Sequence, residues 1–201
     1  SGFKAVLRAY GTILKTSDFR YAILQTAAAS LMLFAYVSLI PSVLMVQFGA
    51  TPVQFGIFFG VNALSLVAGS QINRRVLTRL KTEVVLRNFV LFQAVMTVLL
   101  FTVAHTVPVL YLILPMLMLT IGANTSIGGN SSTLAMAPFK GSAAQASAVV
   151  GVIQNVASAA AAAIVAYLPG EPLNKMTTTM LCIAAVSTTV LVIRERKLVR
   201  S

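Results

Sequence analysis

Acidic residues, cysteine and histidine are scarce in this chain. Its 201 residues include four Asp and Glu, one His and a single cysteine, Cys182. One cysteine cannot form a disulfide bond within the chain. No Asp, Glu or His lies inside a predicted membrane span, so metal sites, paired catalytic carboxylates and Ser–His–Asp triads lack the residues they need. We therefore expect a protein that is not an enzyme and that holds no metal or organic cofactor.

Charge of either sign is missing over long stretches. Residues 21–73, 88–139, 141–170 and 176–193 contain no Asp, Glu, Lys or Arg, and 58% of the chain is hydrophobic. A charge at the centre of a bilayer costs about 2.5–3.5 kcal/mol on insertion scales, so such segments are typical of membrane spans. A span needs about 20 helical residues, so the first two segments hold two helices each and the last two hold one each. The sequence predicts an all-α membrane protein with six transmembrane helices.

Prolines support the limits of these helices. Pro52, Pro108 and Pro172 are each predicted to open a helix, because the N–H that proline lacks has no partner in a first turn. Pro41 is expected to bend the first helix near its outer end. The predicted helices form a six-helix bundle over residues 21–193 and cover about 21–46, 52–72, 88–104, 108–136, 142–167 and 173–193.

The few cations indicate the orientation of the bundle. Fourteen of the fifteen Lys and Arg lie in 4–20, in 74–87, at Lys140 and in 194–200, all on one side of a six-helix chain. This asymmetry follows the positive-inside rule, so both termini are expected in the cytoplasm. The net charge of +11 therefore does not indicate binding to nucleic acid. Residues 1–20 are expected to be a cytoplasmic segment, either a basic amphipathic helix or a solvated linker, and 194–201 a cytoplasmic tail.

Residue size and the order of the helices suggest how they pack. The helix over 142–167 is dominated by small residues, which let membrane helices approach closely, so we expect it in the interior. Val, Leu, Phe and Ile dominate 88–104 and 173–193, which we expect at the periphery. The six helices divide into two triplets, and the first helix of each carries an internal proline. This pattern indicates an inverted three-plus-three repeat.

Uncharged polar side chains lie at membrane depth in several predicted helices. Amides that pointed into hydrocarbon would be costly, so these side chains must contact protein or water. Two interpretations stay open: interhelical hydrogen bonds that hold the bundle together, or a solvated cavity for small amphiphilic substrates. For the set as a whole we favour the cavity, lined by Gln25, Met32, Tyr36, Asn62, Asn124, Gln154 and Asn155.

The inner end of the second predicted helix carries a recognisable motif. The run Gly69-Ser70-Gln71-Ile72-Asn73-Arg74-Arg75 resembles the inner-loop signature of the major facilitator superfamily, in which a glycine precedes an Asp or Asn followed by Arg. Further stretches, taken together and in this order, are similar to the C-terminal half of the bicyclomycin-resistance (Bcr/CflA) family of drug:proton antiporters. They are residues 18–21, 34–38, 51–56, 62–64, 122–125, 134–139 and 146–148.

The resemblance implies one six-helix bundle of a multidrug efflux antiporter in the bacterial inner membrane, driven by the proton gradient. Gly69, Asn73 and Arg74 would belong to the inner gate. Besides the lipid bilayer and amphiphilic drugs, the partner would be a missing N-terminal six-helix half or a second copy of the chain. Two features depart from the family: no carboxylate lies within a span, and Ala143-Ala144-Gln145 stands where a glycine is usual. A homodimeric half-size transporter and a non-transporting membrane subunit remain alternatives.

Overall fold

The computed structural model describes residues 17–139 and 143–200. The secondary structure in this part of the chain is helical, and it includes six candidate membrane spans, the first of which combines α2 with the π-helix η1. The chain is therefore a multi-pass, all-α membrane protein, which confirms the fold class predicted from its apolar segments. The elements are α2 (Ser17–Pro41), η1 (Ser42–Gln47), α3 (Pro52–Leu77), α4 (Thr82–Thr106), α5 (Leu110–Met136), α6 (Ala143–Tyr167) and α7 (Pro172–Arg200).

Prolines and a capping box shape the turns. The α-helical pattern ends at Pro41, and η1 follows it directly, as expected when proline removes a helical hydrogen bond. Gly49, with φ of 67°, then allows the chain to reverse. Thr51 caps α3: its hydroxyl accepts from the Gln54 N–H, while the Gln54 side chain accepts from the Thr51 N–H. Pro52 follows at the first position of the helix, as predicted.

Several predicted helix ends are wrong. Helix α3 continues to Leu77, α4 already begins at Thr82, and α7 extends to Arg200 through the predicted tail. A charge-free segment marks only the part of a helix that lies in lipid. The helix itself can continue beyond that part into water, with charged residues in its last turns. Pro108 lies in the turn before α5, which begins at Leu110 after the extended N-cap residue Val109. The amphipathic segment predicted for residues 3–15 lies outside the described residues.

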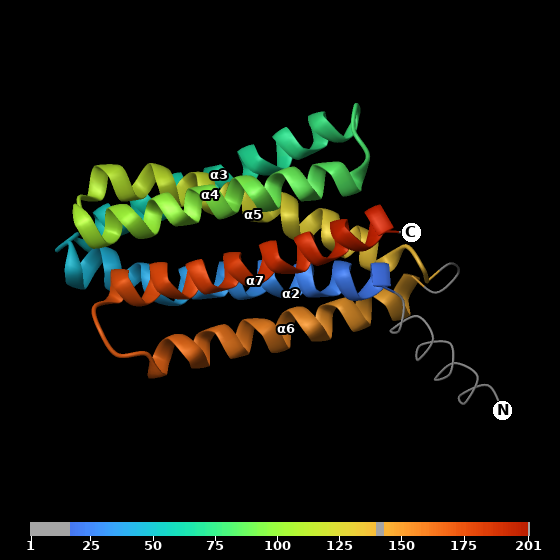
Figure 1. Cartoon of the computed structure of the whole chain (residues 1–201). Helices are drawn as coiled ribbons and strands as arrows, with labels where there is room; N and C mark the ends of the chain where they lie inside the picture. The colour runs from blue at the N-terminus through green and yellow to red at the C-terminus, as the bar shows by residue number, and fades with distance from the viewer. Residues whose placement is uncertain (1–16, 140–142, 201) are drawn as a thin grey trace.

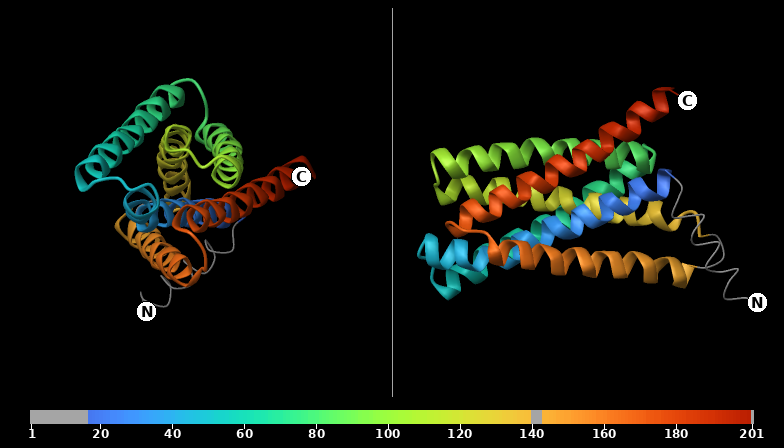
Figure 2. Two further views of the ribbon diagram at one scale, coloured as in Figure 1. Left: turned by 90° about the vertical axis from the view of Figure 1, so that its left-hand side faces the viewer. Right: turned by 60° about the horizontal axis from the view of Figure 1, so that its bottom comes forward.

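Helices α2 and α5 form the centre of the bundle. Helices α3 and α4 pack on α5, helices α6 and α7 pack on α2, and α4 and α7 contact each other (Figures 1 and 2). Each helix of the triplet α2–α4 corresponds in order to one of the triplet α5–α7. Exchanging the helices of each corresponding pair gives this same list of contacting helices. Because α2 and α5 run in opposite directions, the arrangement is the one expected of an inverted three-plus-three repeat.

The small-residue helix α6 is not the interior helix that the sequence predicts. Only 28% of the most apolar 18-residue stretch of α6 is buried, against 50% of the corresponding stretch of α5. Helix α6 packs mainly on α2. The corresponding stretches of α4 and α7, two helices predicted to be peripheral, are 33% and 39% buried and so are more buried than that of α6. Small side chains permit close packing but do not identify the helix that packs against them. An interior helix and a helix that faces a second bundle therefore have similar compositions.

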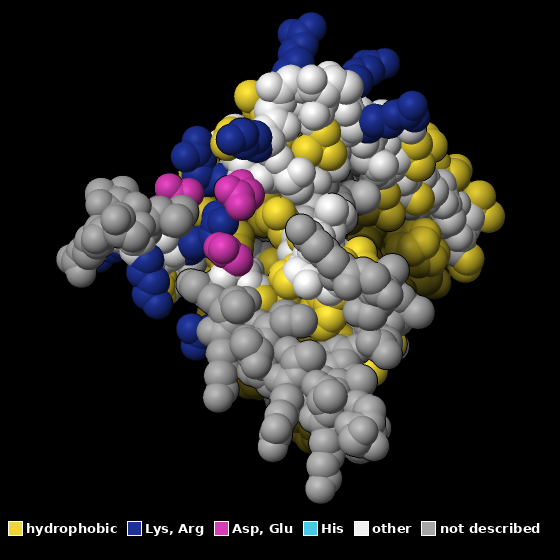
Figure 3. Space-filling view, turned by 90° about the vertical axis from the view of Figure 1, so that its right-hand side faces the viewer, with side chains coloured by type: hydrophobic (Ala, Val, Ile, Leu, Met, Phe, Trp, Pro, Cys, Tyr) yellow, Lys and Arg dark blue, Asp and Glu magenta, His cyan; other side chains and the backbone are white. Residues whose placement is uncertain are grey.

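The cations gather at the end of the bundle where α2 begins and α7 ends (Figure 3), which is called the basic end below. At this end Arg194 of α7 forms ion pairs with Asp18 of α2 at 3.2 Å and with Glu83 of α4 at 3.1 Å. Its guanidinium also lies 4.6 Å from the centre of the Tyr21 ring. A residue predicted to lie in a tail therefore joins three helices.

Helix α3 is held against α5 by the contact of two glycines. A Cβ on Gly69 would overlap the backbone carbonyl of Gly122, and a Cβ on Gly122 would lie 2.9 Å from the Ser65 carbonyl oxygen. The Ser126 hydroxyl donates to the Gly69 carbonyl at 3.2 Å on the same face. The glycine of the inner-loop motif thus sets the close approach of two helices.

Replacing Gly69→Ala should therefore separate α3 from α5 and lower the free energy of unfolding by about 1–3 kcal/mol, the usual cost of overpacking. Thermal unfolding of the purified chain in detergent measures this loss. Gly60→Ala, on the same helix with nothing within 4 Å of its Cβ, is the matched control. It should leave stability unchanged or raise it, because alanine is the better helix former by roughly 1 kcal/mol. Equal stability of the two variants would contradict the close contact.

Candidate functional site

Asn124, near the middle of α5, links three helices. Its Nδ2 donates to the Ala29 carbonyl of α2 at 2.9 Å, and its Oδ1 accepts from Gln93 Nε2 of α4 at 3.1 Å. The Gln93 amide also donates to the Thr120 carbonyl at 3.1 Å. Asn124 is only 5% exposed, so its side chain has little access to water. The main role of the Asn124 side chain is therefore to hydrogen-bond polar groups of α2 and α4.

A small cleft with a mostly apolar surface begins at Asn124 and opens between α2, α3, α5 and α6. Its volume is about 280 Å³, and Gln154 of α6 borders it from the opposite side. The Gln154 Nε2 has one long contact, 3.4 Å from the Ser132 hydroxyl, and the side chain is half-buried. Its amide therefore remains largely available to a ligand. The other residues of the cleft are small, hydroxylic or aliphatic: Ala29, Ser30, Leu33, Leu66, Thr125 and Gly128.

Gln25 and Met32 were predicted to line the cavity, but both side chains are fully buried. Gln25 of α2 donates to the Ser187 carbonyl at 2.8 Å and accepts from the Ser187 hydroxyl at 2.6 Å. Met32 belongs to the main hydrophobic core. Both residues hold α2 against its neighbours, which is the alternative that the sequence left open for single polar residues.

Tyr36 and Asn62 form a second polar contact, between α2 and α3. The Asn62 amide hydrogen-bonds to the Tyr36 hydroxyl, and both residues are buried. The rings of Tyr36 and Phe59 are stacked with centroids 6.5 Å apart. The two residues are not among those that border the cleft with Asn124. Asn155 is exposed on α6 and does not border it either.

The three predicted gate residues have different environments. Gly69 lies in the close contact of α3 with α5. Asn73 and Asn130 exchange two hydrogen bonds, of 2.8 and 3.3 Å, farther toward the basic end of the same contact. Arg74 is exposed, and its side chain forms no hydrogen bond or ion pair with the part of the chain that the structure describes. Two members of the motif thus hold helices together, and the third faces outward.

The sequence analysis missed several of the residues that complete these contacts. Gln93 was a detectable signal, because it is an amide within the apolar segment 88–139. Ser187 and the hydrogen-bonded pair Thr26–Ser131 gave none, since hydroxyl side chains in membrane helices usually bond to their own backbone. Among residues 17–139 and 143–200, no group of three His, Cys, Asp or Glu could hold a metal ion.

No protein-family model and no curated protein matches this chain. Membership of a transporter family therefore stays a prediction that rests on the quoted motifs. Among the described residues, a small cleft lies beside the central helix pair, with the available Gln154 amide on one side and the hydrogen-bonded Asn124 amide on the other.

Asn124→Ala should lower the free energy of unfolding by about 1–2 kcal/mol, because it removes interhelical hydrogen bonds in a buried region. Thermal unfolding in detergent provides the measurement. Asn155→Ala, the same change at an exposed position of α6, is the matched control and should leave stability unchanged. An Asn124→Ala variant as stable as the control would show that the three-helix contact contributes nothing.

Proposed function

We propose that this chain is the C-terminal six-helix half of a proton-coupled multidrug transporter of the major facilitator type. It exports small amphiphilic molecules across a bacterial inner membrane by alternating access, with both termini in the cytoplasm. The observation that carries the proposal is the small cleft beside α2 and α5, which opens between α3 and α6 and has the Gln154 amide at its edge. The order of the family-like motifs along the chain supports the same assignment.

The chemistry of the cleft suits amphiphilic substrates. Gln154 offers an amide, Ser30 and Thr125 offer hydroxyls, and Leu33 and Leu66 offer apolar surface. Binding sites for small molecules usually combine an apolar lining with a few polar groups in volumes of about 300–1,000 Å³. The cleft volume of about 280 Å³ lies just below this range. It agrees with half of a site that a second bundle completes.

A second bundle would cover the cleft between the two least buried helices, α3 and α6. It is either the missing N-terminal half of the transporter or another copy of this chain. Proton coupling requires a group that titrates within the membrane, and this chain has no carboxylate between Asp18 and Glu83 or between Glu83 and Glu171. The second bundle would therefore supply the acid, with the proton gradient as the energy source.

Gln154→Ala tests the cleft without disturbing the packing, because the Gln154 side chain has only one long contact. The change should reduce export of some substrates several-fold and leave others unaffected, since each substrate uses the amide differently. Drug efflux from cells that express the complete transporter measures this. Gln71→Ala, at an exposed position on α3 outside the cleft, is the matched control. An unchanged substrate profile in Gln154→Ala would count against a substrate site here.

Arg74 tests the proposed gate. Arg74→Ala should slow export of every substrate, because a gate residue acts on the conformational change rather than on substrate binding. The same efflux assay with several drugs distinguishes this uniform effect from the selective effect at Gln154. Arg196→Ala, an exposed arginine of α7 at the same basic end, should leave export intact. Loss of only some substrates in Arg74→Ala would contradict the role in gating.

A further inference from the structure

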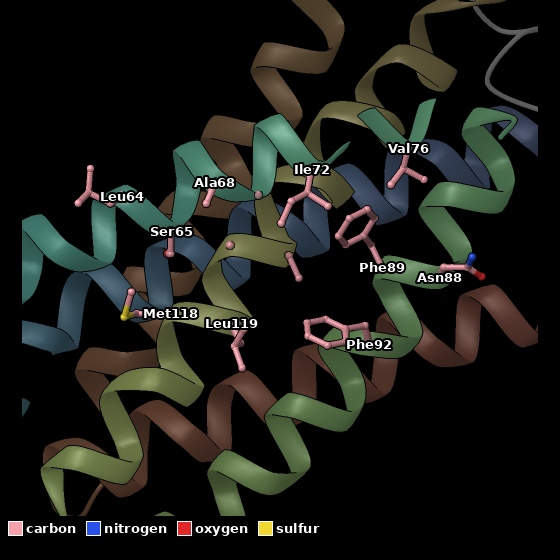
Figure 4. Close-up of a pocket in the computed structure, with 13 residues that line it drawn as sticks. Leu64, Ser65, Ala68, Ile72, Val76, Asn88, Phe89, Phe92, Met118 and Leu119 are labelled. Carbon is pink, nitrogen blue, oxygen red and sulfur yellow. The ribbon is translucent and has the colours of Figure 1, made fainter. Parts of the chain in front are cut away.

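A long apolar groove lies on the other side of α3 from the cleft at Asn124. It runs between α3 and α4 with α5 as its floor and has a volume of about 730 Å³. The two helices diverge from their connecting loop and have few contacts with each other, since each packs on α5. Ile72, Phe89 and Phe92 point into the space between them (Figure 4). Met118, Leu119, Gly122 and Ala123 of α5 line the floor, and the two small residues among them leave room above the backbone.

The length and position of the groove fit one leaflet of a membrane. It extends along α3 from Leu64 to Val76, about 18 Å at the rise of an α-helix. Val76 and Asn88 line the end nearest the α3–α4 loop, at the basic end of the bundle (Figure 4). Half of a hydrocarbon layer measures about 15 Å. The groove thus reaches from the membrane surface at the basic end to about the middle of the bilayer.

The end of the groove at the loop is strongly cationic. Arg75 precedes the lining residue Val76, Arg87 precedes the lining residue Asn88, and Arg79 and Lys81 lie between them. The only acid in residues 74–87 is Glu83, and it already accepts a hydrogen bond from Arg194 at 3.1 Å. Arg75, Arg79 and Lys81 are exposed. The apolar groove therefore ends, at the membrane surface, beside a cluster of cations that are not neutralised by acidic residues of the loop.

We propose that this groove is a binding site for an anionic phospholipid. One acyl chain lies between α3 and α4 against the floor of α5, and the phosphate headgroup binds the cations of the α3–α4 loop. Basic pockets between transmembrane helices have the chemistry to bind anionic headgroups. A zwitterionic lipid would fill the groove equally well but would gain much less from the loop. The site therefore selects lipids by headgroup charge.

The chain contains no tryptophan, so a single introduced tryptophan reports on one position. Phe92→Trp places the reporter in the groove. Val186→Trp places it on an exposed part of α7 outside the groove. The two positions have similar depths, because residue 92 is nine residues from Glu83 and residue 186 is eight from Arg194, its ion-pair partner. The two positions are therefore a matched pair, of which only position 92 lies in the groove.

The full chain is reconstituted into vesicles of phosphatidylglycerol and phosphatidylcholine in equal amounts, with bromine on the acyl chains of one lipid or the other. Bromine quenches tryptophan on contact, and the surface charge is the same in both preparations. At position 92 we expect the anionic lipid to be preferred about fivefold, the ratio that roughly 1 kcal/mol of headgroup attraction gives. At position 186 the two brominated lipids should quench equally.

The loop provides the second arm of the experiment. Adding Arg75→Gln, Arg79→Gln and Lys81→Gln to Phe92→Trp should abolish the preference, and high salt should weaken it. Arg196→Gln with Lys197→Gln removes exposed charges from α7 at the same end and should leave the preference intact. Equal quenching by both lipids at position 92 would overturn the proposal, as would a preference that survives loss of the loop cations. Absence of quenching by either lipid would show that protein covers the groove, which also overturns it.

Discussion

Polar groups on the two central helices have no water to bind, so they bind one another across the bundle. Asn124 joins α5 to α2 and α4, Gln25 joins α2 to α7, and the Thr26–Ser131 pair joins α2 to α5 again. An amide left without a partner in such surroundings costs free energy, which makes each contact specific for one helix pair. These contacts hold the outer helices α4 and α7 against α5 and α2.

The same requirement decides which polar residues are available for function. An amide whose nitrogen and oxygen both bond to other helices has little capacity left for a substrate, as at Gln25 and Asn124. Gln154 has one long contact at the edge of the cleft and retains that capacity. Buried amides therefore define the shape of the cleft, while the half-buried amide at its rim supplies the chemistry.

Helix α3 lies between two hollow surfaces. Leu66 borders the cleft at Asn124, and Leu64 and Ala68 border the apolar groove. The contact of Gly69 with Gly122 fixes the helix between them, so a shift of α3 would change the width of both hollows. A lipid in the groove and a ligand in the cleft would thus act on the same helix from opposite sides.

The sequence alone was enough to predict the six helices, the start of α3 at Pro52 and the clustering of cations at one end. Charge, hydrophobicity and helix periodicity act within one segment, so they can be read from neighbouring residues. Only the tertiary structure decided that Gln25 and Met32 are buried, that α6 is peripheral, that Arg194 joins three helices, and that Gln93 completes the contact with Asn124. Periodicity shows which residues share a helix face, whereas the partner of that face depends on segments up to 176 residues away.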